Sequence, residues 1–223
     1  MCSQSFHNSI AVSKNCFSPI IAKTSCIPIK RGLSIRNLTS YHLTNIMAHI
    51  SIQYFKSPFG ELILGDYENA LCLCDWRYRK MRESVDKRLQ EGLNATYFEE
   101  DTELLQATKT QLTEYAAGER TEFDIPLLFV GTEFQKTVWE ELVRIPYGST
   151  ESYLRLSQKL GNEKAIRAVA SANGANAISI LVPCHRIVGS QGELTGYAGG
   201  IPAKKKLLQL ESKGKYDEQM ELF

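Results

Sequence analysis

The segment that most constrains the fold is an apolar run that ends abruptly at a proline. Residues 178–182 (Ile-Ser-Ile-Leu-Val) have the composition of a short buried strand. Pro183 has no backbone N–H, so the run cannot continue as a central strand. Cys184 is therefore expected where the strand ends, followed by His185 and Arg186. Basic neighbours favour the nucleophilic thiolate form of a cysteine; the alternative is a small buried hydrophobe beside two surface polar residues.

The size and the cysteine pattern narrow the class of protein. A chain of 223 residues can bury one or two cores of ordinary domain size. No stretch approaches the ~18 apolar residues of a membrane helix, so we expect no membrane association. The six cysteines lack the paired spacing of a zinc site, so we expect no metal and a reducing compartment. Cys72 and Cys74 are expected to pack on one face of a strand.

The charge of the chain is unevenly distributed. The formal net charge is +1, but residues 153–206 contain eight Lys or Arg and only two Asp or Glu. Such a local excess suits a surface that faces phosphates, and a solvated lysine face is the alternative. The eight cations are Arg155, Lys159, Lys164, Arg167, Arg186, Lys204, Lys205 and Lys206.

Residues 1–46 differ in composition from the rest of the chain. They contain five Lys or Arg, eight Ser and no Asp or Glu, without sustained periodicity. This composition resembles a transit peptide. The alternative, which we favour, is that the natural chain begins at Met47. On either interpretation we expect little order in this segment.

Residues 47–126 are predicted to form a small α/β domain. Three short runs within residues 50–76 alternate as strands do and are separated by turn residues, which is typical of an antiparallel meander. Residues 102–117 have helical spacing and are followed by a glycine. A linker at 124–131, which contains a proline, then leads to the second half of the chain.

Residues 131–212 are predicted to form a mainly helical domain. Thr132 is a suitable N-cap for a helix that ends before the Ile-Pro-Tyr-Gly stretch at 145–148. Two further short helices, one from Ser152 and one over residues 163–172, are separated by a Leu-Gly-Asn turn. This pattern is typical of a helix-turn-helix.

Pro-Cys-His-Arg at 183–186 and Gly-Tyr-Ala-Gly-Gly at 196–200 resemble the active-site signature of the O6-alkylguanine-DNA alkyltransferase family. The likeness covers about 80 residues in one order, which makes it specific. Cys184 argues against the related alkyltransferase-like proteins, which lack the acceptor cysteine. The other stretches that carry the resemblance are 131–135, 139, 145–148, 152–153, 167–169, 173–176 and 207–211.

The resemblance implies both a fold and a function. The family combines a small N-terminal α/β domain, ribonuclease-like with an antiparallel sheet, and a C-terminal winged helix-turn-helix-like domain that is mainly helical. Its members are suicide repair proteins that move an alkyl group from O6 of guanine in DNA to their own cysteine in a single turnover. Whether O4-alkylthymine is also repaired stays open. We expect no cofactor, and a monomer that binds the minor groove of double-stranded DNA with little sequence preference.

The resemblance assigns the chemistry to four residues. Cys184 attacks the alkyl carbon, and His185 acts as its base through a bridging water. Glu211 is the carboxylate that holds the imidazole, although it would otherwise be read as a helix-surface acid. Asn176 braces the turn before the active-site strand.

The remaining assigned residues are expected to contact DNA or the flipped base. Extruding a base costs a few kcal/mol of unstacking; the resemblance makes Arg167 the side chain that fills the gap and Tyr153 the one that pushes on the phosphate. Small residues of the second helix let it lie close to DNA, with packing against another helix as the alternative. Tyr197 is expected to cover the base, and Gly199 and Gly200 to leave room for the alkyl group. The full expected set is Tyr153, Lys164, Arg167, Ala168, Ala170, Ser171, Arg186, Ser190, Tyr197 and Lys204.

Residues 213–223 form a polar tail. Its last five residues, from Gln219 to Phe223, resemble the pentapeptide with which bacterial replication and repair proteins bind the sliding clamp. A frayed terminus that ends in Leu-Phe by chance is the alternative. Clamp binding would make this a bacterial, cytoplasmic protein, which argues against a transit peptide at the other end.

Interpretations from other classes remain open at this point. A non-catalytic helix-turn-helix protein that binds DNA or senses lesions would keep its function when Cys184 is replaced. A Cys-His acyl hydrolase would turn over more than once, but it does not account for the helix-turn-helix. Fused adaptive-response regulators carry a further four-cysteine zinc domain, which the three cysteines before Met47 do not match.

Overall fold

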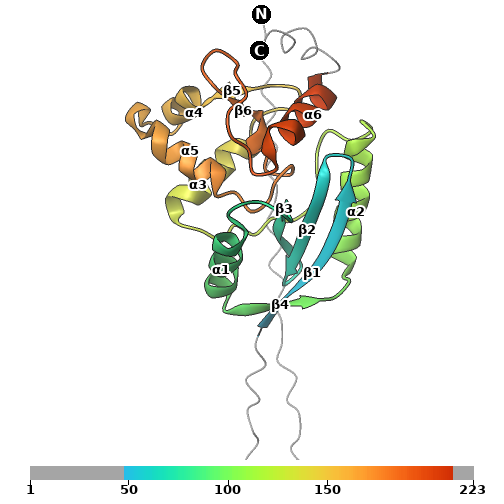
Figure 1. Ribbon diagram of the computed structural model, residues 1–223. Coiled ribbons are helices and arrows are strands. Elements are labelled where there is room, and N and C mark those ends of the chain that lie inside the picture. The colour runs from blue at the N-terminus through green and yellow to red at the C-terminus, as the bar shows by residue number, and fades with distance from the viewer. Residues whose placement is uncertain (1–47, 213–223) are drawn as a thin grey trace, which may run out of the picture. The chain divides into compact units, whose positions relative to one another are not determined.

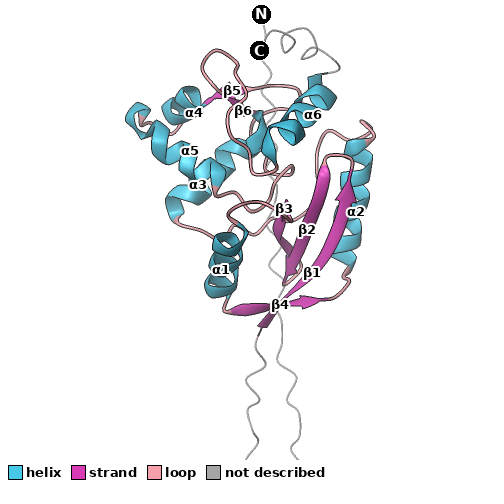
Figure 2. Ribbon diagram, in the orientation of Figure 1, coloured by secondary structure: helices cyan, strands magenta, loops and turns pink. Residues whose placement is uncertain are grey.

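The computed structural model describes residues 48–212 (Figure 1). The expectations for residues 1–46 and 213–223, including the pentapeptide from Gln219 to Phe223, lie outside the described residues. A sheet with two helices forms the first half of the described chain, and helices dominate the second half (Figure 2). No helix within residues 48–212 is long and apolar enough to cross a membrane.

The sheet of the first half has four strands in the order β3-β2-β1-β4. β1 (Ala48–Ser57), β2 (Gly60–Tyr67) and β3 (Ala70–Trp76) form the predicted antiparallel meander. β4 (Ala95–Glu99), which the sequence analysis did not predict, runs parallel to β1. A parallel neighbour needs a crossover connection, and α1 (Arg82–Leu93) provides it. The sheet is therefore mixed, with one parallel pair.

Two helices flank this sheet and bury different cores (Figure 1). α1 packs Val85 and Leu89 into a cluster with Ile50 and other strand residues. α2 (Glu103–Ala116) packs into a second cluster, which continues into the helical half of the chain. Thr102 caps α2 by accepting the backbone N–H of Leu105 at 3.2 Å. The helix predicted over residues 102–117 is therefore present.

The prediction that Cys72 and Cys74 share one face of a strand is wrong. The pairing of β2 with β3 shifts between Gly65 and Asp66, which is the signature of a β-bulge. As a result Cys72 packs in the cluster under α1, whereas Cys74 packs in the cluster that also contains Cys184. A bulge reverses the alternation of side chains along the strand. No local pattern in the sequence predicted this bulge.

Four helices make up most of the second half: α3 (Glu133–Val143), α4 (Tyr153–Lys159), α5 (Ile166–Gly174) and α6 (Gly200–Ser212). Thr132 begins α3 with a capping box, because its hydroxyl accepts the N–H of Gln135 and its own N–H donates to that side chain. Short strands β5 (Glu151–Ser152) and β6 (Ile187–Val188) pair in parallel and form the small wing.

α4 and α5 form the predicted helix-turn-helix. Ser152 caps α4 by accepting the N–H of Arg155 at 3.2 Å, and a 3-10 turn at Glu163–Ala165 leads into α5. The buried face of α5 packs on α3, where the indole of Trp139 donates to the carbonyl of Ala172 at 2.8 Å. This contact fixes α5 to the body of the protein and leaves its opposite face exposed.

The apolar run at 178–182 is buried as predicted, but it does not form a regular strand. Ile178 makes only an isolated bridge to Cys74 of β3. Ile180 has a φ of 73°, a left-handed conformation that turns the chain. The N–H of Val182 then donates to the carbonyl of Ile178 at 2.9 Å. The cysteine at 184 therefore follows a tight turn docked on β3.

Candidate active site

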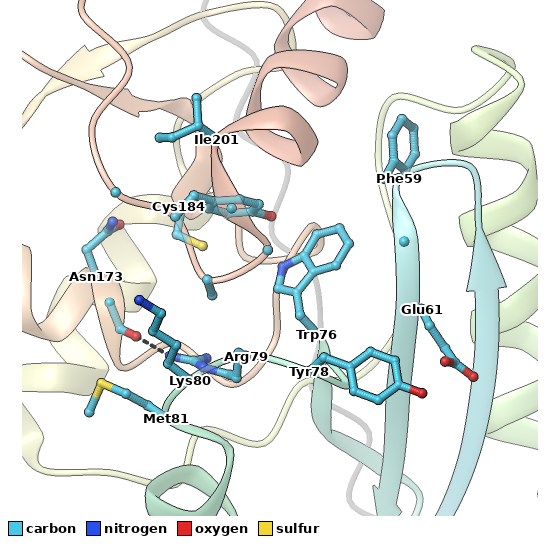
Figure 3. A pocket seen from close by; sticks show the side chains of 17 residues that line it. Phe59, Glu61, Trp76, Tyr78, Arg79, Lys80, Met81, Asn173, Cys184 and Ile201 are labelled. Atoms are coloured by element: carbon cyan, nitrogen blue, oxygen red, sulfur yellow. Dashed lines mark hydrogen bonds between the residues drawn. The ribbon is translucent and has the colours of Figure 1, made fainter.

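Cys184 lies on the wall of a cavity of about 760 Å³ between the two halves (Figure 3). This volume is in the range of small-molecule and cofactor sites. Asn173 and the loop 196–201 line one side with Cys184, and Trp76 with the loop that follows β3 lines the other. The remaining lining residues are Phe59, Gly60, Glu61, Tyr78, Arg79, Lys80, Met81 and Gly174.

Asn176 holds the buried thiol. Its Nδ2 donates to Sγ of Cys184 at 3.2 Å and to the carbonyl of Val182 at 3.0 Å, while its Oδ1 accepts the N–H of Ile178 at 2.9 Å. Burial raises the pKa of the Cys184 thiol, and the hydrogen bond from Asn176 opposes this only in part. The charges of Lys204 and Arg79 also lower this pKa, but burial outweighs them, so the pKa of the thiol is raised and not lowered as expected.

His185 is fully buried, and its Nε2 lies 2.9 Å from Oε1 of Glu211. A carboxylate only accepts hydrogen bonds, so Nε2 carries the proton and Nδ1 presents a lone pair. Nδ1 has no hydrogen-bond partner within residues 48–212. Burial lowers the pKa of His185, against the opposing pull of Glu211. The imidazole is therefore neutral and able to accept a proton.

Glu211 is the centre of a buried polar cluster. Its carboxylate accepts Nε of Arg186 at 2.9 Å and Nη2 at 2.8 Å, the hydroxyl of Tyr115 at 2.7 Å, and the N–H of Gly148 at 3.2 Å. Burial alone would raise its pKa, but the hydrogen bonds from His185 and Arg186 outweigh burial and hold the pKa at about 2. Glu211 is thus a fixed negative charge beside the imidazole.

Two members of this cluster were missed from the sequence. Tyr115 lies in the helix predicted over residues 102–117, and the helical pattern did not assign it to the site. Gly148 read only as a helix stop, yet its φ is 73° and a Cβ there would lie 2.9 Å from the backbone oxygen of Glu211. Glycine is required at that position by both conformation and space. The contacts join residues 63 and 96 positions apart in the chain, which no local pattern reveals.

Two of the eight cations counted toward a phosphate-facing surface are not on the surface, and that part of the expectation is wrong. Arg186 is buried and also donates to the carbonyl of Ile145 at 2.5 Å. Lys204 is fully buried, and its Nζ donates to the carbonyls of Ile187 at 2.5 Å and Thr195 at 3.0 Å. Burial lowers the pKa of Lys204 to about 8. Both side chains tie loops together inside the protein.

Five of the other residues expected to contact DNA lie on α5 or the turn that precedes it. Lys164, Arg167, Ala168 and Ser171 are exposed there, and Ala170 is half-buried. The packing alternative for the small residues therefore does not apply to Ala168.

Tyr153 and Ser190 lie elsewhere. Tyr153 is half-buried at the start of α4, and Ser190 is exposed in the turn after β6. Tyr153, Arg167 and Ser190 do not line the cavity, whereas Tyr197 does.

Trp76, at the end of β3, forms a wall that the sequence analysis missed. Its ring contacts Tyr197 edge to face, with 5.7 Å between centroids, and Tyr197 lies 6.3 Å from the ring of His185. A Cβ on Gly199 would lie 2.3 Å from the indole. Gly199 therefore makes room for Trp76, a role that the sequence did not indicate.

The cavity offers no obvious metal site. Among the residues from 48 to 212, no group of three His, Cys, Asp or Glu is placed to hold a metal ion. The site itself brings together a thiol, a neutral imidazole and a buried carboxylate, the kinds of group from which an activated nucleophile is built.

Comparisons with known proteins match both halves of the chain. Residues 50–129 match the ribonuclease-like domain of 6-O-methylguanine DNA methyltransferase, and residues 133–213 match the DNA-binding domain of the same family. A methylated-DNA--protein-cysteine methyltransferase of Methanosarcina acetivorans is 43% identical over 157 residues, which cover 70% of this chain and 95% of the relative.

Solved structures agree with this match. The crystal structure of the Mycobacterium tuberculosis O6-methylguanine methyltransferase is 38% identical, with a TM-score of 0.63, and the match covers 74% of this chain and 93% of that one. A crystal structure of Mycobacterium tuberculosis OGT in complex with DNA matches with the same identity and TM-score, over 74% of this chain and 94% of that one.

Proposed function

The chain belongs to the 6-O-methylguanine DNA methyltransferase family, and we propose that Cys184 is the residue that accepts the alkyl group. The protein is a DNA-repair enzyme that binds DNA and acts as a methylated-DNA--protein-cysteine methyltransferase. The non-catalytic interpretation is not favoured, because the relatives are named for methyl transfer. The observation that carries the proposal is a thiol on a cavity wall next to an imidazole that a buried carboxylate orients.

The proposed reaction is a single displacement. The proton of the Cys184 thiol passes to Nδ1 of His185, through a bridging water, and Glu211 stabilises the imidazolium. The thiolate sulfur then forms a bond to the alkyl carbon, while the bond from that carbon to O6 breaks and its electron pair goes to the guanine. The guanine anion takes up one proton at N1 from water, and the imidazolium of His185 returns one proton to water, so the protons balance. The products are a thioether at Cys184 and an unmodified guanine. Because a thioether is not hydrolysed under mild conditions, each molecule acts once. The displacement involves only the thiol and the alkylated base, so we propose that no cofactor is needed.

The contact with DNA is proposed to run through α5 and the wing. The helix would lie in the minor groove, where small residues such as Ala168 let its backbone approach closely, and Arg167 would fill the space that the flipped base leaves. Tyr153 would push on the rotated phosphate, and Tyr197 would cover the base in the cavity. One copy of the chain presents all of these groups, so we propose that it acts as a monomer.

Further expectations belong to the same proposal. We propose a division into domains at residues 47–126 and 131–212, and a cytoplasmic location.

The tail from Gln219 to Phe223 would dock two apolar side chains on a bacterial sliding clamp, with the glutamine setting the register. Deleting these five residues should abolish binding to purified clamp and leave alkyl transfer unchanged; unchanged clamp binding would overturn the tail's role.

The test of the function is stoichiometric transfer. Purified protein is incubated with duplex DNA that carries a radiolabelled methyl group on guanine O6, and label on the protein is counted. We expect about one equivalent for the wild type and none for Cys184→Ala. Cys72→Ala is the matched control, since Cys72 is also buried and free, and it should transfer normally. Label on Cys184→Ala, or turnover beyond one equivalent, would contradict the proposal.

A further inference from the structure

The sheet domain holds the segment that joins the DNA-facing helix to the cysteine. At the end of α5, Arg79 donates from Nη2 to the carbonyl of Gly174 at 2.6 Å and from Nη1 to the carbonyl of Asn176 at 3.0 Å. Arg88 of α1 donates to the carbonyl of Ala175, between them, at 2.7 Å. Two arginines from one half of the protein thus occupy three successive carbonyls in the other half.

Arg79 is itself held by a buried acid. Asp75 of β3 is completely buried, and its Oδ2 accepts Nη1 of Arg79 at 2.7 Å and Nη1 of Arg82 at 3.1 Å. Its Oδ1 accepts the hydroxyl of Ser179 at 3.2 Å. Only 8% of Arg79 is exposed, and its guanidinium donates to three acceptors, which favours a fixed orientation. Figure 3 shows Arg79 at the base of the cavity, below Cys184.

The hydrogen bonds of Arg79 are linked to the sulfur of Cys184 through Asn176. Arg79 holds the main chain of Asn176, and the side chain of Asn176 donates to Sγ of Cys184 at 3.2 Å. Gly174, the other residue that Arg79 holds, is the last residue of the helix that carries Arg167. One guanidinium therefore contacts both the end of the DNA-facing helix and the residue that supports the thiol.

We propose that Asp75 and Arg79 are positioning residues that set the distance between the DNA-facing helix and the acceptor sulfur. α5 has only nine residues, and its C-terminal carbonyls carry the negative end of the helix dipole, which a fixed cation stabilises. A flipped base is fixed in the DNA that α5 holds, so a shift of α5 relative to Cys184 displaces the alkyl carbon from the sulfur. A displacement of about 1 Å costs on the order of 100-fold in rate. The inference rests on the proposed role of Cys184.

The experiment separates positioning from folding by a single-turnover reaction at saturating O6-methylguanine duplex. Arg79→Met keeps a long apolar stem and removes the donors. We expect its rate constant to fall about 10- to 100-fold, while the amplitude stays at about one equivalent and the concentration of DNA at half-saturation changes little. A residue needed only for folding would do the reverse, lowering the amplitude without changing the rate constant of the molecules that remain folded.

Three further variants complete the test. Arg79→Lys retains the charge beside Asp75 but has a single donor group, so its rate constant should lie between those of the wild type and Arg79→Met. Asp75→Asn should also lower the rate constant. If Arg79→Met does not fold, Asp75→Asn and Arg79→Lys provide the test in its place.

Arg77→Met is the matched control, because Arg77 contacts Glu61 and Tyr54 within the sheet domain. Unchanged rate constants in the Arg79 and Asp75 variants, or an equal loss in Arg77→Met, would overturn the proposal. Transfer of one equivalent of label to the wild type in the same assay would support the proposed function even if the Arg79 and Asp75 variants overturn the positioning role.

Discussion

The cluster around Glu211 and the exposed face of α5, which we propose serve the same reaction, are built in opposite ways. In the cluster, the carboxylate oxygens of Glu211 accept five hydrogen bonds from His185, Arg186, Tyr115 and Gly148, and Glu211 itself is only 4% exposed. On the helix face, Arg167 and its small neighbours have few partners within the protein. The carboxylate of Glu211 has its partners within the protein, whereas the helix face exposes side chains that, on the proposed function, contact DNA.

The difference follows from what each region must do. A proton acceptor next to a thiol needs a fixed tautomer, and a fully bonded buried carboxylate supplies it. A surface that finds a lesion in any sequence must instead fit the DNA backbone wherever the lesion occurs, so small and mobile side chains suit it. We therefore expect substitutions in the cluster to cost folding free energy and substitutions on the helix face to cost DNA affinity.

Replacing the central carboxylate should have the largest effect. Glu211→Gln removes the negative charge and leaves the buried guanidinium of Arg186 without its counter-charge, which typically costs 3–5 kcal/mol, so we expect about 4 kcal/mol. Urea denaturation at pH 7 measures this loss. The folded fraction should also transfer methyl groups more slowly, since the imidazole of His185 loses its orienting acceptor.

The control for this substitution is Glu119→Gln, an exposed glutamate that follows α2. It makes the same chemical change and should alter the free energy of unfolding by less than about 0.5 kcal/mol. Equal effects of the two substitutions would show that the cluster around Glu211 contributes no more than a surface charge.

Lowering the pH should reduce the free energy of unfolding through His185 and Glu211 of the same cluster, without any substitution. The pKa values of His185 and Glu211 are both lowered in the folded protein. For such groups the unfolded chain binds protons more tightly, so stability falls as pH falls. The loss from His185 begins near pH 6.5, and that from Glu211 runs from pH 4.5 to about 2. The second window corresponds to about 3 kcal/mol. Urea midpoints between pH 7 and pH 2.5 should follow this course, and Glu211→Gln should lose the acid part of the slope.

Features fixed by neighbours in the chain were predictable. The cap at Thr132, the helix over residues 102–117, the meander and the helix-turn-helix all have local signals, and the structure contains each of them. The two-domain fold class is also confirmed, because both domain models of one family match the chain.

Features fixed by contacts across the chain were not predictable. α1 buries only Val85 and Leu89, so its apolar pattern is too sparse to stand out, and β4 exists only as a partner of β1. The burial of Lys204 and the wall formed by Trp76 depend on loops that meet only in the folded protein. The left-handed turn at Ile180 goes against the preference of a β-branched residue and is set by the packing around it.

On the helix face, removing the arginine should affect DNA and not stability. We expect Arg167→Ala to weaken the reaction with methylated duplex by about tenfold, equivalent to ~1.4 kcal/mol, because the space left by the flipped base is no longer filled. Its urea midpoint should match that of the wild type. Lys87→Ala, which removes an exposed charge from α1, is the control for a general loss of positive charge. A similar weakening in Lys87→Ala would show that Arg167 acts only through its charge.

The smallest effect, and the finest test of the comparison, comes from two alanines of one helix. Ala168 is exposed on α5, whereas Ala172 is 2% exposed beneath Trp139. Ala168→Leu should leave the urea midpoint unchanged and raise the concentration of duplex at half-saturation about threefold to tenfold, since a larger side chain holds the helix away from the groove. Ala172→Leu should instead overpack the core and lower the free energy of unfolding by about 1–3 kcal/mol.

Ala107→Leu, on the exposed face of α2, controls for the added apolar surface. If Ala168→Leu binds methylated duplex as tightly as Ala107→Leu does, the small residues of α5 do not serve close approach to DNA, and the contrast with the buried cluster rests on Arg167 alone.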